Sequence, residues 1–486
     1  MAFKAQPGRP LGPVFDEYPP ATREEVAAAA QQAAELGRDR DVRKQLAELY
    51  ERMISRRGER EEWLRSPTKA HLSYFADDTE LPLLTLDELL VRTRDLDGGD
   101  DGFRRTPMRN LLARFELDEN PVRQLDNRVT RLRREGMGPR RLAAIGALLR
   151  RHGYQATMNQ CHPLGYTTKS VFGDVGPEPS NRPTLPTYPG DELPDGWSAV
   201  AVAVLDTGIV DDSKESGQAR TDGWLSNVAR DRSGKPNGNI DPLYEIAGGP
   251  EFDNGAGHGT FVTGVLQQVD PHADISVLRV LGADGIGSDV EVAIGILEAV
   301  QRKARILNLS LGAETADDQP PLATLVALEL IAERRRDGRL ETDVVLVAAA
   351  GNNRNTRPVW PAAFCTIPTF GVRVVSVAAL AANREPADFS THGFWITCST
   401  IGNGVLSTFV LGEETPEMDP SPDSWTAVNP WAIWTGTSFA APQVAGAIAR
   451  RCQTTHETPS QALDWLLAQG VWVPDYGRSL EILPAG

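Results

Sequence analysis

Short, continuous apolar runs that alternate with helix-like segments constrain the fold of this chain more than any other feature. Runs that are apolar at nearly every position are typical of parallel strands buried on both faces of a sheet. Five such runs occur, at 200–205, 275–281, 306–309, 344–350 and 374–378. Segments with helical patterning lie between them, at 262–268, 290–302 and 322–336. This alternation predicts an α/β domain with a doubly wound, mostly parallel sheet.

Chemically useful side chains follow the predicted strands. Asp206 comes directly after the first run, and Asn352 follows the fourth in the pair Gly-Asn. Ligands of such sheets bind beyond the carboxyl ends of the strands. His258 lies in Gly-His-Gly-Thr, where glycines on both sides let another molecule approach the imidazole closely. Taken singly, an aspartate after a strand is often only a turn former, and a lone histidine is usually structural.

Ser438 stands in Gly-Thr-Ser, at the start of a helix of small residues. A helix N-terminus offers unpaired N–H groups and partial positive charge. A serine there can present its hydroxyl to a carbonyl group while nearby N–H groups receive the developing oxyanion. Alone, Gly-Thr-Ser is more commonly a helix cap. With Asp206 and His258, however, it completes the set of a nucleophile, a base and a carboxylate that orients the base.

Four motifs carry a family resemblance. They are Asp-Thr-Gly at 206–208, Gly-His-Gly-Thr at 257–260, Ala-Ala-Gly-Asn at 349–352 and Gly-Thr-Ser-Phe-Ala-Ala-Pro at 436–442. In this order they resemble the subtilisin-like serine peptidases, whose triad follows the chain order Asp, His, Ser. The resemblance covers about residues 197–486. It implies an endopeptidase that acts on proteins or peptides through an acyl-enzyme.

The same resemblance implies a role for each motif residue. Ser438 would be the nucleophile, His258 the base, and Asp206 the carboxylate that orients it. Asn352 and the Ser438 N–H would form the oxyanion hole. Three backbone segments would hold the substrate: Ser310, Leu311 and Gly312; Ala349, Ala350 and Gly351; and Leu281 with Gly282. In that family the first two segments flank the pocket for the residue before the cleaved bond.

Three departures from the family pattern limit what can be transferred. Many members interrupt the helix after the His motif with a calcium-binding loop, whereas 264–271 here runs almost directly into the next strand. We therefore expect no metal site there, and no cofactor. Phe261 replaces a second histidine that is common in the His motif. An acidic, Ser- and Pro-rich stretch at 412–429 is expected to form a surface loop near the site.

Composition narrows the range of partners and compartments. A net charge of −16 in 486 residues argues against nucleic acid as a partner of the whole chain. The four cysteines form no Cys-x-x-Cys pattern, so neither a disulfide framework nor a zinc site is indicated. No apolar run reaches transmembrane length, and the first residues lack the apolar core of a signal peptide. These features predict a cytoplasmic protein without membrane association.

The region ahead of the α/β domain carries no recognised function. We expect residues 1–160 to form a mainly helical regulatory or recognition domain, and 161–196, rich in Pro and Gly, to link it to the catalytic domain at 197–486. Helix signals include capping boxes at 22–25 and 85–88 and apolar spacing over about 121–135 and 139–151. Such a domain can be an inhibitor, a chaperone, or a module that binds a regulatory protein partner.

Charge is unevenly distributed along the chain. Thirteen arginines against six acids give 101–152 a charge of +7, so the rest of the chain carries −23. One reading is a nucleic-acid or partner sensor whose output is proteolysis, and a further alternative is a catalytically idle scaffold. The opposite charges favour a third possibility, in which the N-terminal region docks on the catalytic domain. Apolar positions on its expected helices support docking: Leu125, Val129, Leu132, Leu142, Ile145, Leu148 and Leu149.

Overall fold

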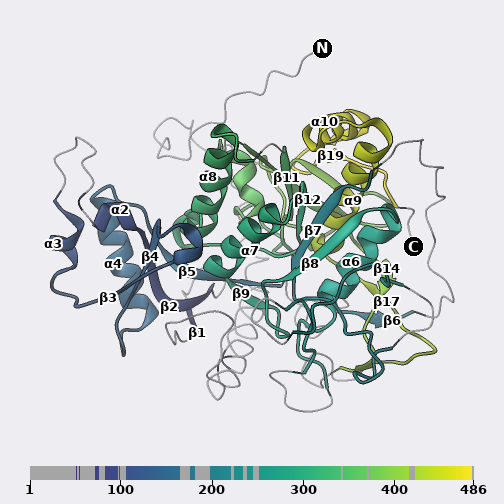
Figure 1. Cartoon of the computed structure of the whole chain (residues 1–486), viewed down its shortest axis with the longest axis horizontal. Helices are drawn as coiled ribbons and strands as arrows, with labels where there is room; N and C mark the ends of the chain where they lie inside the picture. Colours follow the sequence, from purple (N-terminus) through teal and green to yellow (C-terminus); the bar gives the residue numbers. More distant parts are fainter. Residues whose placement is uncertain are drawn as a thin grey trace, which may run out of the picture.

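The computed structural model describes most of the chain after residue 71. The described residues are 51, 54, 72–75, 83–96, 98, 106–164, 176–180, 198–219, 224–233, 238–244, 251–340, 343–368, 371–414 and 422–483. They form a large α/β domain and a smaller β-sheet domain, which lies beside two helices of the larger one (Figure 1). The capping box at 22–25 lies outside the described residues.

An eight-stranded sheet is the centre of the α/β domain. Its order is β18-β19-β13-β12-β11-β10-β7-β8, and only β18 runs antiparallel to its neighbour. All five predicted runs are strands of this sheet, which confirms the doubly wound, mostly parallel fold. The strands are β7 (Ala201–Asp206), β8 (Asp274–Arg279), β10 (Ile306–Leu309), β11 (Val344–Ala349), β12 (Val372–Leu380), β13 (Cys398–Ile401), β18 (Val471–Val473) and β19 (Gly477–Ser479).

Helices cover both faces of the sheet, because each strand carries apolar side chains on both of its faces. In β7, for example, Leu205 belongs to one apolar core and Val204 to the other. Helices α7 (Asp289–Gln301) and α8 (Leu322–Arg336) pack on the first face. Helices α6 (His258–Val269), α9 (Thr437–Thr455) and α10 (Pro459–Gln469) pack on the second.

Smaller strands border the α/β domain. Strand β14 (Val405–Thr408) pairs with β17 (Trp431–Trp434), and β17 also pairs with the short β6 (Glu178–Pro179). Strands β15 (Gly412–Glu413) and β16 (Ser424–Trp425) form a separate pair within the acidic stretch. Strand β9 (Ile286–Ser288) precedes α7 and pairs with a strand of the N-terminal domain.

The N-terminal domain is built on an antiparallel sheet. The strand order is β3-β4-β2-β5, with β1 also paired to β2, and α4 packs on β2 and β5. Two strand–helix–strand units are thus interleaved in one sheet. The strands are β1 (Leu72–Phe75), β2 (Leu83–Arg92), β3 (Asp118–Pro121), β4 (Val129–Arg133) and β5 (Ala156–Pro163). The helices are α2 (Thr93–Leu96), α3 (Met108–Leu112) and α4 (Pro139–Arg151), with a 3₁₀ turn at Arg123–Leu125.

The mainly helical N-terminal domain is therefore not confirmed. The helix expected at 139–151 is present as α4, but the one expected over 121–135 is wrong. There Asp126 and Asn127 adopt left-handed backbone conformations, with φ of 52° and 56°, between β3 and β4. The capping box at 85–88 lies inside strand β2. Pairing of β2 with β4 and β5 outweighs these local helix signals.

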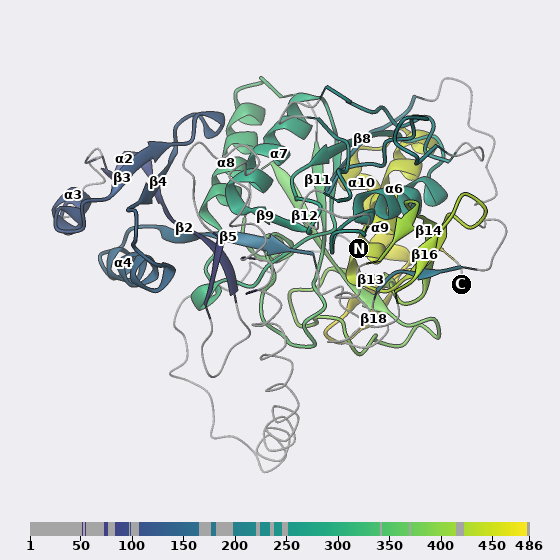
Figure 2. The ribbon, with the colours of Figure 1, turned by 90° about the horizontal axis from the view of Figure 1, so that it is seen from below.

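The N-terminal sheet packs on α7 and α8, as both views show (Figures 1 and 2). Leu125 and Val129 belong to the same apolar core as these helices, whereas Leu132, Leu142, Ile145 and Leu149 form the domain's own core. Two bidentate ion pairs cross the interface, from Arg92 to Glu329 and from Arg128 to Glu333. The docked arrangement that the charge distribution predicts is thus present in the structure.

Side chains of β5 cap both of these helices. The Thr157 hydroxyl accepts a hydrogen bond from the Leu322 N–H at 3.3 Å, and the Asn159 side-chain oxygen accepts one from the Val290 N–H at 3.4 Å. These N–H groups lie in the first turns of α8 and α7 and have no partner within their own helix. The last residues of β5 pair with β9, in the register Cys161↔Ser288 to Pro163↔Ile286.

The predicted linker is partly described. Residues 161–164 and 176–180 include the end of β5 and strand β6, and both of these pair with strands of the α/β domain. Within the described part of the chain, no helix is long and apolar enough to cross a membrane.

Candidate active site

Asp206 and His258 meet at the carboxyl edge of the central sheet. Asp206 ends β7, and His258 is the first residue of α6. The His258 Nδ1 atom lies 2.8 Å from Asp206 Oδ1, which also accepts the Thr207 N–H at 2.8 Å. Asp206 is completely buried and His258 is only 2% exposed. The carboxylate therefore fixes the imidazole in one orientation and leaves Nε2 available for proton transfer.

A glycine is required next to His258. A Cβ atom on Gly259 would lie 2.2 Å from the carbonyl oxygen of Gly208. Any other residue would push α6 away from the segment that follows Asp206, and would break the Asp206–His258 contact. The glycine that follows His258 is thus explained by the close approach of the protein's own backbone.

Ser438 is the second residue of α9 and is 5% exposed. Its hydroxyl donates to the carbonyl oxygen of Ser310 at 3.2 Å, and the Ser310 hydroxyl donates to the carbonyl oxygen of Ser438 at 2.7 Å. The described contacts include no hydrogen bond from Ser438 to His258. The two residues are nevertheless neighbours, since the rings of His258 and Phe439 have centroids 5.5 Å apart. Without a substrate, catalytic hydrogen bonds are often incomplete in this way.

Asn352 points its amide toward the same place. Its Oδ1 accepts the Thr437 N–H at 3.0 Å and the Thr437 hydroxyl at 2.9 Å. Because a backbone N–H can only donate, the atom facing it must be the oxygen, so Nδ2 points away from Thr437. The Thr437 hydroxyl also accepts the Gly351 N–H at 3.1 Å. Thr437 of the Gly-Thr-Ser motif therefore holds the Asn352 amide in position.

Aromatic rings enclose His258 on one side. Trp434 meets the imidazole edge-on at 5.2 Å between centroids. Phe261 packs on Trp434 at 5.5 Å and on Phe439 at 4.6 Å. The residue that replaces a histidine of the family motif is thus part of an apolar wall behind the base. Such a wall excludes water and strengthens the electrostatic interaction between His258 and Asp206.

Two of the three predicted substrate-binding segments lie beside Ser438, one through Ser310 and the other through the contact of Gly351 with Thr437. Strands β10 and β11 are paired up to Leu309 and Ala348, and the segments 310–312 and 349–351 continue beyond this pairing. Leu281 and Gly282 are buried in a turn, in which the Gly282 N–H donates to the Ile286 carbonyl oxygen at 3.0 Å. Their contact with a substrate stays a prediction, and β9, just after this turn, carries the strand edge that β5 occupies.

Asp241, a buried carboxylate that no sequence pattern marks, links the segment that carries Asp206 to the segment that carries His258. Asp241 Oδ2 accepts the Thr207 hydroxyl at 2.9 Å and the Gly257 N–H at 2.9 Å. These donors belong to the residues directly after Asp206 and directly before His258. Burial raises the pKa of Asp241 from 3.8 to about 7, against the opposing effect of its hydrogen bonds and of Arg279. Nothing in the local sequence marks this aspartate, since its donors come from distant segments.

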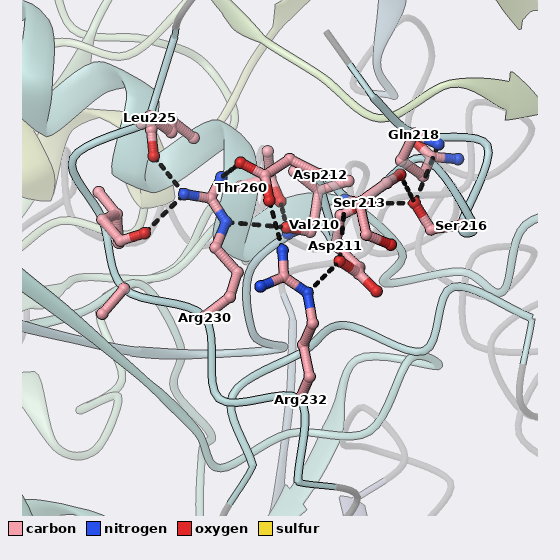
Figure 3. A network of polar contacts seen from close by, with 12 residues as sticks. Val210, Asp211, Asp212, Ser213, Ser216, Gln218, Leu225, Arg230, Arg232 and Thr260 are labelled. Carbon is pink, nitrogen blue, oxygen red and sulfur yellow. Dashed lines mark hydrogen bonds and ion pairs between the residues drawn. The ribbon is translucent and has the colours of Figure 1, made fainter.

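A second network ties the chain after Asp206 to helix α6 (Figure 3). The Val210 N–H donates to the Thr260 hydroxyl at 2.9 Å. The Arg230 guanidinium donates to the carbonyl oxygens of Val210, at 3.2 Å, and Leu225. Arg232 binds Asp211 through Nε at 2.6 Å. These contacts fix the spacing between the strand that carries Asp206 and the helix that carries His258.

Among the described residues, no group of three or more His, Cys, Asp or Glu side chains could hold a metal ion. Helix α6 continues without interruption to Val269, and β8 begins at Asp274. The direct connection expected from the sequence is therefore present, and the chain has no inserted loop at this point.

Comparison with known proteins agrees with this geometry. The sequence model of the subtilase family (peptidase family S8) matches residues 198–468, more than half of the chain. The chain belongs to the subtilase family. The matched segment contains Asp206, His258, Asn352 and Ser438, the residues that the structure brings together at one edge of the sheet.

Subtilases of known name share about a quarter to a third of the aligned residues with this chain. A thermostable alkaline protease of Halalkalibacterium halodurans is 30% identical over 224 residues, which are 43% of this chain and 52% of the relative. Subtilisin BL of Lederbergia lenta is 29% identical over 262 residues, which are 52% of this chain and 76% of the relative. The chain thus spans about half of the first of these subtilases and about three quarters of the second.

One subtilase structure resembles more than the catalytic domain. The crystal structure of fervidolysin from Fervidobacterium pennivorans, described as a keratinolytic enzyme related to subtilisin, aligns with a TM-score of 0.53. The alignment covers 85% of this chain and 63% of fervidolysin, at 19% identity. At this identity the likeness concerns the fold alone. Because 85% exceeds the share of the chain that the subtilase model matches, the likeness extends beyond residues 198–468.

The titration of Asp241 predicts a pH-dependent stability. We expect the difference in unfolding free energy between a Ser438→Ala protein and the same protein with Asp241→Asn to change with pH. The folded pKa of about 7 exceeds the ordinary value of 3.8, so the stabilisation that comes with the protonated carboxyl is complete below pH 3.8. This stabilisation is lost as the pH rises to 7. The unfolding free energy of the protein with Asp241 should then fall by up to roughly 4 kcal/mol relative to that of the Asp241→Asn variant. Urea denaturation from pH 4 to 8 measures this change.

Asp211→Asn in the same background is the control. Burial raises the pKa of Asp211, but the hydrogen bond and charge of Arg232, with the Ser213 N–H, outweigh this effect and lower it. The stabilisation by the ionised Asp211 carboxylate is complete above pH 3.8 and is lost only below it, so the difference between these two proteins should stay nearly constant between pH 4 and 8. A difference for Asp241→Asn that stays constant between pH 4 and 8 would contradict the raised pKa.

Proposed function

We propose that the chain is a serine endopeptidase that hydrolyses peptide bonds through an acyl-enzyme. The observation that carries the proposal is the buried Asp206–His258 hydrogen bond, set beside Ser438 at a helix N-terminus and the oriented amide of Asn352. A nucleic-acid sensor has less support, since Arg131 and Arg133 of the basic segment face Glu88 and Asp87 across the N-terminal sheet.

The geometry supports the following first half-reaction. His258 Nε2 takes the proton of the Ser438 hydroxyl while Oγ attacks the carbonyl carbon of the substrate. Asp206 stabilises the imidazolium that forms. The carbon–nitrogen bond then breaks, His258 returns the proton to the leaving amine, and the acyl group stays on Ser438 as an ester.

The second half-reaction regenerates the enzyme. A water molecule gives a proton to His258 and attacks the ester carbon. The bond to Ser438 breaks, Ser438 recovers its proton from His258, and the second product leaves as a carboxylic acid. In both halves the carbonyl oxygen becomes negative, and the Asn352 Nδ2 and Ser438 N–H groups would donate to it; the orientation of the Asn352 amide and the position of Ser438 in the first turn of α9 support this role.

Ser438→Ala is the direct test of the nucleophile. We expect the variant to fold, to lose labelling by a fluorophosphonate, and to retain at most about 10³–10⁴ of rate enhancement over water. The matched control is Ser424→Ala, since Ser424 is an exposed serine of the same domain in β16. Labelling that persists in Ser438→Ala and disappears in the control would place the nucleophile elsewhere.

The Thr437 hydroxyl gives a test of the oxyanion hole. Thr437→Val removes one of the two hydrogen bonds that orient Asn352, and leaves Nδ2 itself in place. We expect kcat to fall about tenfold with little change in KM, less than the roughly 10²–10³-fold loss expected for Asn352→Ala. Thr437→Ser should restore kcat because it restores the hydroxyl. A loss that appears only in KM would show that Thr437 acts on substrate binding instead.

We further propose that the N-terminal domain controls access to this site. Extended peptides commonly bind proteins by adding a strand to an exposed sheet edge. The β9 edge, next to the buried turn at Leu281–Gly282, is taken by β5, and the pairing continues as the Leu164 N–H donates to the Gly285 carbonyl oxygen at 2.9 Å. A substrate strand would have to displace β5 in order to use this edge.

The interface ion pairs make this control testable. Arg92→Ala combined with Arg128→Ala removes both bidentate pairs to α8, which are partly exposed. Each pair stabilises the docked arrangement by up to about 1 kcal/mol. The loss of both should therefore raise peptidase activity on a small peptide roughly 5–30-fold. Added salt should raise wild-type activity and have less effect on the double variant.

Arg109→Ala is the control for these substitutions. Arg109 forms an ion pair with Glu119, and both residues belong to the N-terminal domain. This variant should keep wild-type activity. Equal activities of the double variant, the control and the wild type would show that docking of the domain does not regulate the site.

The physiological targets belong to the same proposal. We place them among intracellular proteins or peptides, supported by four cysteines that are all free thiols. A regulatory protein partner would act by drawing the N-terminal domain away from α7 and α8.

A further inference from the structure

The loop that carries Asn352 packs closely against two other segments. Gly351, just before Asn352, has a φ of 97°, a backbone conformation that favours glycine. A Cβ atom on Gly351 would lie 3.2 Å from the hydroxyl oxygen of Thr391. A Cβ atom on Gly436 would lie 3.3 Å from Asn352 Nδ2, so the amide nitrogen lies beside the turn that precedes helix α9. The direction of this amide therefore depends on how the loop backbone is held.

Thr391 contacts the residues on both sides of Asn352. Its N–H donates to the Gly351 carbonyl oxygen at 2.9 Å, and its hydroxyl accepts the Asn353 N–H at 3.1 Å. The first bond fixes the peptide group that precedes Asn352, and the second fixes the peptide group that follows it. Thr391 is completely buried. Replacing its hydroxyl by a methyl group would therefore leave the Asn353 N–H without this acceptor.

The segment that holds Thr391 is anchored to the central sheet. The Ser390 hydroxyl accepts the Ala379 N–H at 3.0 Å and donates to the Thr391 carbonyl oxygen at 3.0 Å. Ala379 is the last residue but one of β12, and β12 pairs with β11, the strand that leads into the Asn352 loop. The position of Thr391 relative to this loop is therefore set by two neighbouring strands of one sheet.

A buried carboxylate holds the part of the loop that follows Asn352. Glu314 Oε1 accepts the side-chain N–H groups of Asn353 at 2.8 Å and Asn355 at 2.7 Å. Glu314 Oε2 forms an ion pair with Arg357, with 2.8 Å to Nη1. Glu314 is 4% exposed, so water competes little for these contacts. One carboxylate thus binds three side chains within the five residues after Asn352.

We propose that Thr391 and Glu314 are positioning residues for the oxyanion-hole amide. This inference rests on the proposed peptidase function and on the proposed role of Asn352. Thr437 orients the side chain of Asn352, whereas Thr391 and Glu314 hold the backbone from which that side chain projects. Oxyanion donors are effective because they are already oriented when the charge develops. A loosened loop should therefore weaken binding of the transition state more than binding of the substrate.

Thr391→Val in the full-length protein is the main test. It removes the hydroxyl, and retains the side-chain size and the N–H bond to Gly351. We expect kcat on a peptide substrate to fall about 3–10-fold with little change in KM, as for the loss of one hydrogen bond that matters in the transition state. Thr391→Ser should restore kcat, because it restores the hydroxyl.

Glu314 gives a second, independent pair of variants. Glu314→Ala removes the acceptor of both asparagine side chains, and should lower kcat by about 3–10-fold or more with little change in KM. Glu314→Gln keeps an oxygen that can accept these N–H groups, and should recover most of the loss. This pair decides the question if Thr391→Val fails to fold.

An Asn352→Ala background separates positioning from a general structural effect. Residues that act through one group show non-additive substitutions. If Thr391 and Glu314 act through the Asn352 amide, Thr391→Val and Glu314→Ala should each lower kcat by less than about twofold once that amide is absent. Losses as large in this background as in the wild type would overturn the inference.

Thr397→Val is the matched control. The Thr397 hydroxyl also accepts a backbone N–H, that of Ser376 at 3.2 Å. Thr397 lies directly before the amino end of β13, and therefore at the edge of the sheet opposite to Ser438. This variant should keep the wild-type kcat and KM, even if its unfolding midpoint in urea falls as far as that of Thr391→Val.

Different failures have different meanings. A wild type that cleaves peptides, with an unchanged kcat in Thr391→Val and Glu314→Ala, overturns the inference and leaves the peptidase function standing. The same holds if both variants change KM alone, or if Thr397→Val loses as much kcat as Thr391→Val. A wild type that cleaves no peptide and does not react with a fluorophosphonate overturns the peptidase function, and the positioning roles with it.

Discussion

The parallel pairing of β7, β10 and β11 is the constraint on which the rest of the site depends. The register Leu309↔Leu205 and Leu309↔Ala348 brings the carboxyl ends of three strands to one edge. Each end then supplies a different group: a carboxylate from Asp206, a backbone wall from Ser310 and an amide from Asn352. Helices α6 and α9 begin above the same edge and add His258 and Ser438. These groups can meet because the sheet register has already placed the segments that carry them together.

The α/β half of the fold could be predicted because its signals are local. A strand buried on both faces is apolar at most of its positions, and this pattern identified β7, β8, β10, β11 and β12. The motif residues were also visible, since a Gly-flanked His and a Gly-Thr-Ser helix start are short patterns. Asp241 was not visible, because its hydrogen-bond donors belong to segments that are distant in the sequence. Thr437 stands in the Gly-Thr-Ser pattern, but its contact with Asn352 follows from the three-dimensional structure alone.

The N-terminal half could not be predicted for a related reason. Its strands carry buried charged residues, which are stabilised by an ion-pair partner on a neighbouring strand. Arg131 of β4 and Glu88 of β2 form such a pair. Apolar residues at 125, 129 and 132 fit a helix as well as a turn followed by a strand. The structure divides them between two cores, with Leu125 and Val129 facing α7 and α8 and Leu132 facing the domain's own interior. Pairing of β4 with β2 and β3 outweighs the local apolar spacing and makes this segment a turn followed by a strand.

The pairing of β5 with β9 also sets how a substrate must compete. A strand edge accepts one neighbour, and the present neighbour is part of the same chain. Linked segments meet at an effective concentration on the order of millimolar, whatever the concentration of the protein. A peptide at micromolar concentration that needs the β9 edge therefore competes with β5, whose effective concentration is far higher, even where the two bind equally well. Under the control of access proposed above, such a chain would favour targets presented at high local concentration, for example those bound beside it in an assembly, over peptides that arrive by free diffusion.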